Sequence, residues 1–241
     1  MKIRILHLYH DLLNLYGEYG NVCALERSLS NQGAEVEVDK LSLYDEVDFS
    51  DYDFIYLGSG TEEKQLKALE DMKNNKSDIR SAYDKGTIIL ATGNSFEMFG
   101  KTITTPDGSR VDGLGWLDIE TTVNDKQRTL TDEICSAEFL DKPCVGFINK
   151  ASEIISKEKP MFVSDFGTGN SKQDKNEGVV KGGFYGTHLT GPCLVKNPHL
   201  LAYFAGLVAE KKELSLKPLE LKFEARAYEI TLEALRGRMN R

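Results

Sequence analysis

The sequence predicts an α/β fold with a mostly parallel central sheet and helices on both of its faces. Through the first hundred residues, short apolar runs that fit buried strands alternate with longer segments of helical period. Later segments are short, rich in Thr and Val and separated by turns, which predicts antiparallel strands. A continuous apolar stripe near the end predicts a C-terminal helix.

The expected strands of the first half are 3–9, 34–41, 54–57 and 87–92. Helices are expected from Asn21 as N-cap to a glycine stop at Gly33, from Thr61 as N-cap to about residue 74, and over 77–85. Strands joined through helices in this order are typical of a parallel sheet.

The second half is expected to be built from short strands and two helices. Pro106-Asp107-Gly108 is a turn signal, and a polar loop is expected from Gly167 to Gly178. The strand candidates are 117–123, 128–135, 144–149, 161–165 and a last sheet strand within 182–192. Helices are expected over 198–210 and 219–238, the second with an apolar stripe of Leu221, Ala225, Tyr228, Leu232 and Leu235.

The composition favours a protein that binds small molecules or other proteins. The 241 residues include 30 Lys and Arg against 38 Asp and Glu, a formal net charge of -8, so no basic surface for nucleic acid is expected. No run of about 18 apolar residues and no signal-peptide pattern occur, and we expect a cytoplasmic protein without membrane insertion. The length fits one domain over 1–212 and a helical extension over 213–241 that packs on this domain or on a partner.

Neither a metal nor a disulfide framework is expected. The four cysteines have no CxxC pair and no zinc spacing, so we expect reduced, mostly buried thiols at Cys23, Cys135, Cys144 and Cys193. His7 and His10 are three residues apart, which on a strand places them on opposite faces and disfavours joint metal binding.

The stretch from Thr87 to Gly100 is where the sequence predicts the reactive centre. An apolar run breaks at Gly93 and becomes helix-like, which indicates a strand, a tight turn and a helix start. At such a junction one side chain can stand at the sheet edge while helical N–H groups point at the same place, an arrangement that suits a nucleophile facing an oxyanion. Glycine has no heteroatom in its side chain and cannot be that nucleophile. The sequence therefore predicts an active-site framework without its central group.

Four groups of residues resemble motifs of a known family. They are Leu13 to Asn21, Gly58 to Thr61 with Gln65, Thr105 to Gly108 with Gly113 to Gly115, and Gly186 to Pro192 with Lys196 and Asn197. By this set, which spans most of the chain, the protein resembles the cobyric-acid-synthase-like (CobB/CobQ-like) class I glutamine amidotransferases. The resemblance implies a flavodoxin-like sheet, no cofactor, and glutamine hydrolysis through a cysteine thioester. It also implies ammonia delivery to a Mur-ligase-like synthetase in peptidoglycan lipid II amidation, with a cobyric-acid-synthase-related domain as the alternative.

Both members of the family's catalytic dyad are replaced in this chain. The family cysteine follows the central strand, which is the position of Gly93, and the family histidine of a Gly-Thr-Tyr-Leu-His-Gly-Pro pattern falls on Thr190. Removing a member of such a dyad lowers the rate by on the order of 10⁴-fold or more, because attack and proton transfer act as one unit. We therefore expect the resemblance to predict fold and partner better than activity.

Relocated catalysis is the alternative to lost catalysis. His188 lies two residues from Thr190, so on a strand the two side chains share a face and His188 becomes a substitute base, although a hydrogen-bonded cleft residue is the plainer interpretation. Ser95 and Thr92 are the other hydroxyls near Gly93. Ser95 belongs to the first helical turn and Thr92 points to a different side, so neither is a good replacement nucleophile.

Glutamine or another small carboxylate is expected to bind at this junction even without hydrolysis. The candidate ligand-binding residues are Ser59, Gly60, Gly93, Asn94, Ser95 and Arg128. N–H groups of Ser59, Gly60 and the helix N-terminus suit an anion, and the resemblance adds Arg128, which can grip a carboxylate at two points. The plainer interpretations are helix capping by Asn94 and Ser95 and a solvated strand position for Arg128.

These observations leave three functional hypotheses. The first is an active glutaminase subunit that works through relocated groups such as His188. The second, which we favour, is a degenerate subunit that keeps the fold and the partner surface but not the hydrolysis. The third is a flavodoxin-like module for a phosphorylated ligand, which no Walker or dinucleotide fingerprint supports.

Overall fold

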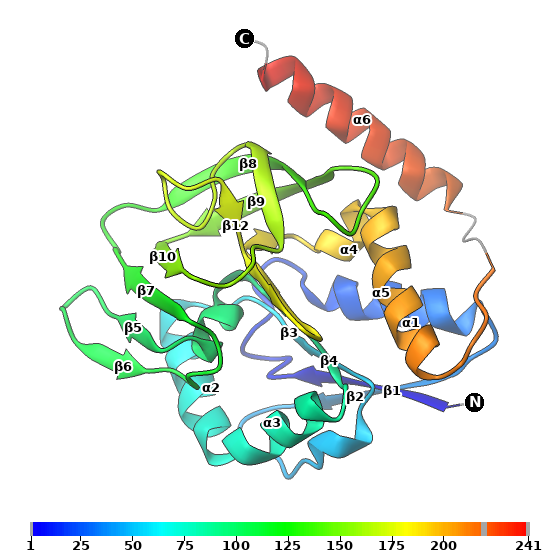
Figure 1. Cartoon of the computed structure of the whole chain (residues 1–241), viewed down its shortest axis with the longest axis horizontal. Helices are drawn as coiled ribbons and strands as arrows, with labels where there is room; N and C mark the ends of the chain where they lie inside the picture. Colours follow the sequence, from blue (N-terminus) through cyan, green and yellow to red (C-terminus); the bar gives the residue numbers. More distant parts are fainter. Residues whose placement is uncertain (1, 218–220, 240–241) are drawn as a thin grey trace.

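The computed structural model describes residues 2–217 and 221–239 and is built around a six-stranded sheet (Figure 1). Its order is β13-β14-β4-β3-β1-β2, in which only the β13–β14 pair is antiparallel. The strands are β1 (Lys2–Leu8), β2 (Glu35–Leu41), β3 (Phe54–Leu57), β4 (Ile88–Thr92), β13 (Val179–Lys181) and β14 (Phe184–Thr187). The mostly parallel sheet predicted from the sequence is confirmed.

Helices cover both faces of this sheet (Figure 1). One face carries α1 (Tyr19–Ser30), α4 (Cys193–Lys196) and α5 (Pro198–Lys211), and the other carries α2 (Glu62–Asn74), α3 (Lys76–Asp84) and the 3-10 helix η2 (Gly93–Phe99). A second 3-10 helix, η1, spans Phe49–Asp51. As predicted, Thr61 caps α2, because its hydroxyl accepts a hydrogen bond from the N–H of Lys64 at 3.3 Å.

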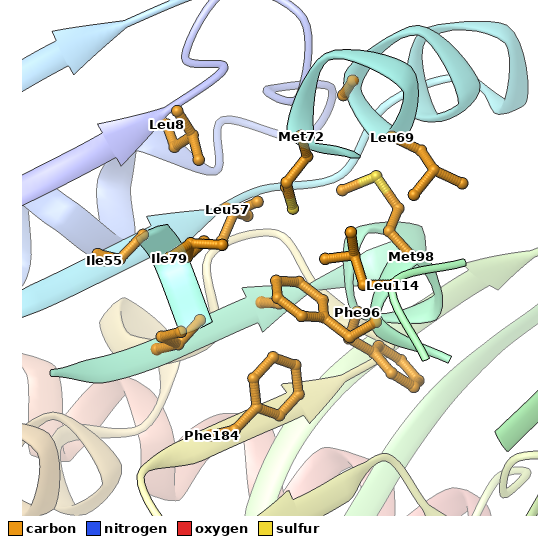
Figure 2. Close-up of a cluster of buried hydrophobic side chains, with 14 of the residues drawn as sticks. Leu8, Ile55, Leu57, Leu69, Met72, Ile79, Phe96, Met98, Leu114 and Phe184 are labelled. Carbon is orange, nitrogen blue, oxygen red and sulfur yellow. The ribbon is translucent and has the colours of Figure 1, made fainter. Parts of the chain in front are cut away.

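Alternate residues of each central strand enter two different hydrophobic cores. In β3, Ile55 and Leu57 face the core under α2 and α3, whereas Phe54 and Tyr56 face the core under α1 and α5. Figure 2 shows Ile55 and Leu57 in the first of these cores, together with side chains from α2, α3 and η2. Burial on both faces explains why β3 and β4 have almost no polar residues in the sequence.

Two smaller sheets follow the central one. The four-stranded sheet has the order β10-β7-β5-β6 and contains β5 (Thr102–Thr104), β6 (Arg110–Asp112), β7 (Ile119–Val123) and β10 (Ser152–Ser156). The five-stranded sheet has the order β12-β11-β8-β9-β15 and contains β8 (Thr129–Ser136), β9 (Cys144–Lys150), β11 (Phe162–Phe166), β12 (Asn176–Glu177) and β15 (Leu189–Thr190). All their pairs are antiparallel except β5–β7.

Two local predictions are wrong. The segment 182–192 does not form one strand, because β14 ends at Thr187 in the central sheet and β15 pairs with β9 in the five-stranded sheet. Asn21 does not cap α1 but lies buried inside it, where its amide donates to the Tyr56 hydroxyl at 2.7 Å and its Oδ1 accepts from the N–H of Leu194 at 2.8 Å. The Asn21 side chain can be buried because both of its polar atoms have hydrogen-bond partners.

The C-terminal helix α6 (Lys222–Met239) packs against its own chain. Three residues of the predicted stripe, Tyr228, Leu232 and Leu235, are buried against Ile134 and Val145 of β8 and β9. The expected helix start at Leu219 lies outside the described residues. Among the helices in the described ranges, none has the length and apolar character needed to cross a membrane.

Candidate functional site

The junction of β4 and η2 is as sharp as the sequence predicts, and its first residue is Gly93. Gly93 has a φ of +63°, which glycine adopts without strain. A Cβ atom built on Gly93 would lie 2.3 Å from Oγ and 2.4 Å from Cβ of Ser59. The place where a nucleophile's side chain would begin is therefore filled by the Ser59 side chain.

Thr190, the other expected dyad position, is buried and bound to its neighbour strand. Its hydroxyl donates to the backbone carbonyl of Phe147 in β9 at 3.0 Å. A threonine hydroxyl does not accept a proton near neutral pH, so this position supplies no general base.

The buried carboxylate of Glu18, just before α1, lies beside this junction near the carboxyl ends of β3 and β4. Its Oε2 accepts hydrogen bonds from the hydroxyls of Tyr56, at 2.6 Å, and Thr92, and its Oε1 accepts from the N–H of Gly191 at 2.9 Å. Burial, followed by the negative charge of Glu18, raises the pKa of the Tyr56 phenol well above its ordinary value of 10.0. Glu18 falls in the first matched motif, but nothing in the sequence predicts that these partners converge on it.

His188 does not share a strand face with Thr190, because the chain leaves β14 at Thr187 and enters β15 at Leu189. The ring is buried between two carboxylates, with Nε2 3.1 Å from Oε1 of Glu97 and Nδ1 3.4 Å from Oε1 of Glu177. The expectation that His188 and Thr190 lie on one face is therefore wrong. A histidine enclosed in this way is fixed in the interior rather than directed into an open cleft.

Four of the expected ligand-binding residues, Ser59, Gly60, Asn94 and Arg128, do line one small chamber, which we call the inner cavity. Gly93 and Ser95 do not line it. Its volume is about 10 Å³, which is about the room that one water molecule needs. Glutamine is several times larger than water, so the inner cavity is closed to it in this conformation.

Asn94 and Ser95 do not cap η2. The Asn94 side chain forms two hydrogen bonds with Gly60, accepting from its N–H at 3.0 Å and donating to its carbonyl at 3.0 Å. The Ser95 hydroxyl is within hydrogen-bonding distance of the carbonyls of Thr92, at 2.9 Å, and Leu57, at 3.2 Å. The capping interpretation is wrong for both residues, and the Gly60 N–H that was expected to hold an anion is already used by Asn94.

Arg128 lies just before β8 and contacts a carboxylate of its own chain. Its Nη1 donates to Oε1 of Glu62 at 2.7 Å, and its Nε donates to Oδ1 of Asn149 at 2.9 Å. The Asn149 amide in turn donates to the Tyr16 hydroxyl at 2.7 Å. Arg128 is thus held on two sides rather than freely solvated.

Two further ionisable groups, Glu97 and Lys150, line the inner cavity. Glu97 accepts a hydrogen bond from the Gln65 amide at 2.9 Å, and the Lys150 ammonium donates to the carbonyls of Gly169 and Asn170 at 2.8 and 2.6 Å. Burial lowers the pKa of Lys150 from its ordinary value of 10.5. Within 2–217 and 221–239, no three His, Cys, Asp or Glu side chains are grouped so that they could hold a metal ion.

Sequence and structure comparisons agree on what the chain resembles. Residues 4–198 match the sequence profile of the CobB/CobQ-like glutamine amidotransferase domain. The chain is 30% identical over 224 residues, which are 93% of it and 91% of the relative, to the GatD subunit of the glutamine-hydrolysing lipid II isoglutaminyl synthase of Staphylococcus aureus (strain N315). It is also 30% identical over 214 residues, 88% of it and 82% of the relative, to the GatD subunit of Streptococcus pneumoniae (strain ATCC BAA-255 / R6). A crystal structure of a glutamine amidotransferase superposes with a TM-score of 0.55 at 17% identity, covering 85% of this chain and 98% of that one.

Proposed function

Because the chain belongs to the CobB/CobQ-like glutamine amidotransferase family, we propose that it is a GatD-like subunit that has lost glutamine hydrolysis. One observation carries the proposal, namely that the Ser59 side chain fills the place where a nucleophile on residue 93 would begin. A cysteine thiolate cannot be accommodated at residue 93 unless Ser59 moves.

The loss of the base supports the same proposal. Thr190 cannot accept the proton of a nucleophile, and His188 is enclosed between Glu97 and Glu177 instead of facing the inner cavity. Loss of either dyad member alone lowers such rates by on the order of 10⁴-fold. With both lost and the inner cavity closed, glutamine hydrolysis is not expected from this chain.

The similarity to GatD over most of the chain supports a partner of the same kind. We propose that the chain associates with a Mur-ligase-like synthetase that amidates peptidoglycan lipid II, and that this synthetase takes ammonia from solution. As part of this proposal, the chain works in the cytoplasm, where its four cysteine thiols stay reduced.

Co-expression with a Mur-ligase-like synthetase tests this function. We expect the two chains to co-purify and the complex to amidate lipid II with ammonium chloride but not with glutamine. Glutamine-dependent amidation would contradict the loss of hydrolysis, whereas failure of the two chains to associate would contradict the partner.

The outcomes separate two parts of the proposal, because association depends on the surface of the chain and glutamine use depends on the groups around Gly93. If glutamine is used and His188→Ala abolishes this use, while association persists, the relocated-base hypothesis replaces the degenerate one.

A further inference from the structure

An open depression lies at the junction of α2 and α3, against the loop that joins β6 to β7, and we call it the basic depression. Three cationic side chains line it, those of Lys73, Lys76 and Arg80, together with Trp116. None of the described residues that line it carries a carboxylate or also lines the inner cavity. In a chain with a formal net charge of -8, such a local excess of positive charge favours an anionic ligand.

The three cations come from consecutive turns of the chain. Only Asn75 separates α2 from α3, and its N–H still donates to the carbonyl of Met72 at 3.1 Å. Lys73, Lys76 and Arg80 follow one another at steps of three and four residues, which places side chains on one face of a helix. At the rise of an α-helix the first and the last are roughly 10 Å apart along the axis, so one small ligand can contact all three side chains.

Arg80 is held in position while two of its nitrogens stay free. Its Nε donates to both carboxylate oxygens of Asp84, at 3.0 and 3.1 Å. Its guanidinium carbon lies 5.4 Å from the ring centroids of both Tyr83 and Trp116. Within residues 2–217 and 221–239, its Nη1 and Nη2 form no hydrogen bond. A guanidinium fixed in this way can bind two oxygens of one phosphoryl group.

The walls of the basic depression are also fixed. The Tyr83 hydroxyl donates to the carbonyl of Lys181 at 2.7 Å, and the backbone N–H of Trp116 donates to the carbonyl of Phe99 at 2.9 Å. Beside Trp116, a Cβ atom built on Gly115 would meet no atom within 4 Å, so the depression is open to solvent there. A ligand therefore does not have to order this part of the site when it binds.

The number of cations decides which anion fits. Among the ion pairs of the described residues, none involves Lys73 or Lys76. An exposed ion pair changes affinity by up to about fivefold, so a ligand with a single charge gains little here. A diphosphate group carries several negative charges on two adjacent phosphoryl groups and can contact the guanidinium and both ammonium groups at once.

We propose that the basic depression binds a diphosphate group, either free or as an ester such as a nucleoside diphosphate. Arg80 binds one phosphoryl group through Nη1 and Nη2, and Lys73 and Lys76 neutralise the other. This binding involves neither the junction at Gly93 nor a synthetase, so its failure would not affect the function proposed above.

Titration of the whole chain with inorganic pyrophosphate, followed by calorimetry and by tryptophan fluorescence, tests the proposal. Trp116 is the single tryptophan of the chain, so a change in emission reports on the depression itself. In buffer without divalent cations we expect saturable binding that is at least about fivefold tighter than that of phosphate, because two phosphoryl groups meet more cations than one. This binding should weaken as the ionic strength rises.

Adenosine diphosphate distinguishes the two sources of the diphosphate group. Binding at least as tight as that of pyrophosphate would support a site for diphosphate esters. Binding of pyrophosphate that is much tighter than that of adenosine diphosphate would support a site for the free anion.

Substitutions of the lining residues locate the site. Arg80→Lys keeps the charge but removes the planar guanidinium, and we expect it to weaken pyrophosphate binding by about tenfold. Lys73→Gln and Lys76→Gln are each expected to weaken it by up to about fivefold. Lys85→Gln is the matched control, because Lys85 is exposed beyond the other end of α3 and does not line the depression. We expect this variant to bind within about twofold of wild type, since only a screened surface charge is removed.

Four results would overturn the proposal. The first is that pyrophosphate shows no saturable binding up to about 10 mM. The second is that it binds without changing the emission of Trp116, which would place it elsewhere. The third is that Lys85→Gln weakens binding as much as Lys76→Gln, which would mean a general charge effect. The fourth is that folded Arg80→Lys, checked by circular dichroism, binds as tightly as wild type.

Discussion

The two sides of the junction differ in how completely they are closed. On the reactive side, Ser59 fills the space beside Gly93, and Thr190 and His188 are bonded into the interior. On the carboxylate side, Arg128 is held by a half-exposed ion pair with Glu62. The reactive side is packed as part of the core, whereas the carboxylate side is only covered by an ion pair.

The difference shows that packing, as well as residue identity, sets how easily each side of the junction can be changed. Interiors are close-packed, so restoring a reactive side chain at Gly93 requires a change in its neighbour as well. A half-exposed ion pair needs no repacking to open. The following predictions test this contrast, from the largest expected effect to the smallest.

Removing the buried histidine is expected to give the largest loss of stability. His188→Ala takes away the group that lies between Glu97 and Glu177, and we expect it to lower the free energy of unfolding by about 3–5 kcal/mol. Urea unfolding measures the change, with His10→Ala, in the partly exposed loop after β1, as the control. A loss no greater than that of the control would show that His188 is not part of a tightly packed core.

Placing a thiol at the family's nucleophile position is expected to destabilise the chain. Gly93→Cys combines a positive φ with a clash against Ser59, and we expect a loss of about 2–4 kcal/mol. Ser59→Gly in the same chain should recover part of this loss, because the nearest remaining atom is the Ser59 Cα, 3.2 Å from the added Cβ.

This prediction is checked by measuring the free energy of unfolding of Gly93→Cys, of Gly93→Cys with Ser59→Gly, and of Ser59→Gly alone. If Gly93→Cys is as stable as wild type, or if Ser59→Gly gives no recovery, the space beside Gly93 is not closed in the way described.

The core around Tyr56, whose hydroxyl bonds Glu18 beside the junction, is also expected to respond to acid. His7 lies under Tyr56, with ring centroids 5.3 Å apart, and burial, followed by the charges of His10 and Lys40, lowers its pKa from 6.5 to about 4. The unfolded chain therefore binds a proton more readily, so stability is fully present above pH 6.5 and is lost as the pH falls through 4. The expected loss is roughly 3 kcal/mol, and His7→Phe should remove this part of the pH dependence.

Denaturant unfolding at several pH values between 4 and 7 measures this effect. A wild type and a His7→Phe variant with the same pH dependence would contradict the burial of a neutral histidine there.

Opening the carboxylate side is expected to change stability least. Arg128→Ala removes a half-exposed pair, and we expect a change of about 0.2–1 kcal/mol that diminishes at high salt. Unfolding at low and high ionic strength measures it. A salt-independent loss of several kcal/mol would place Arg128 in the structural core and remove the contrast between the two sides.

The sequence predicts many of the helices and strands, because these elements depend on local patterns of residues. The apolar run before Gly93 gives β4 and its turn, Thr61 gives the start of α2, and the stripe through Tyr228 and Leu232 gives the buried face of α6. In each case the hydrophobic period or a capping side chain acts within a few residues.

The details of the site depend on contacts between distant segments and are not visible in local patterns. The Ser59 side chain lies against Gly93, which is 34 positions later in the chain. Asn94 forms its hydrogen bonds with Gly60, at the same separation, instead of capping the helix. The strand is interrupted at His188 because Thr187 pairs within the central sheet, whereas Leu189 pairs with β9 of the five-stranded sheet. Tertiary partners of this kind override local propensity.

Release of ammonia from glutamine by the purified wild-type chain, alone and with the proposed synthetase partner, tests the central claim most directly. We predict a rate equal to that of buffer in both conditions, because Gly93 has no nucleophilic side chain and Ser59 fills the space beside it. Ammonia release above buffer that His188→Ala abolishes would contradict this account, provided that the variant remains folded.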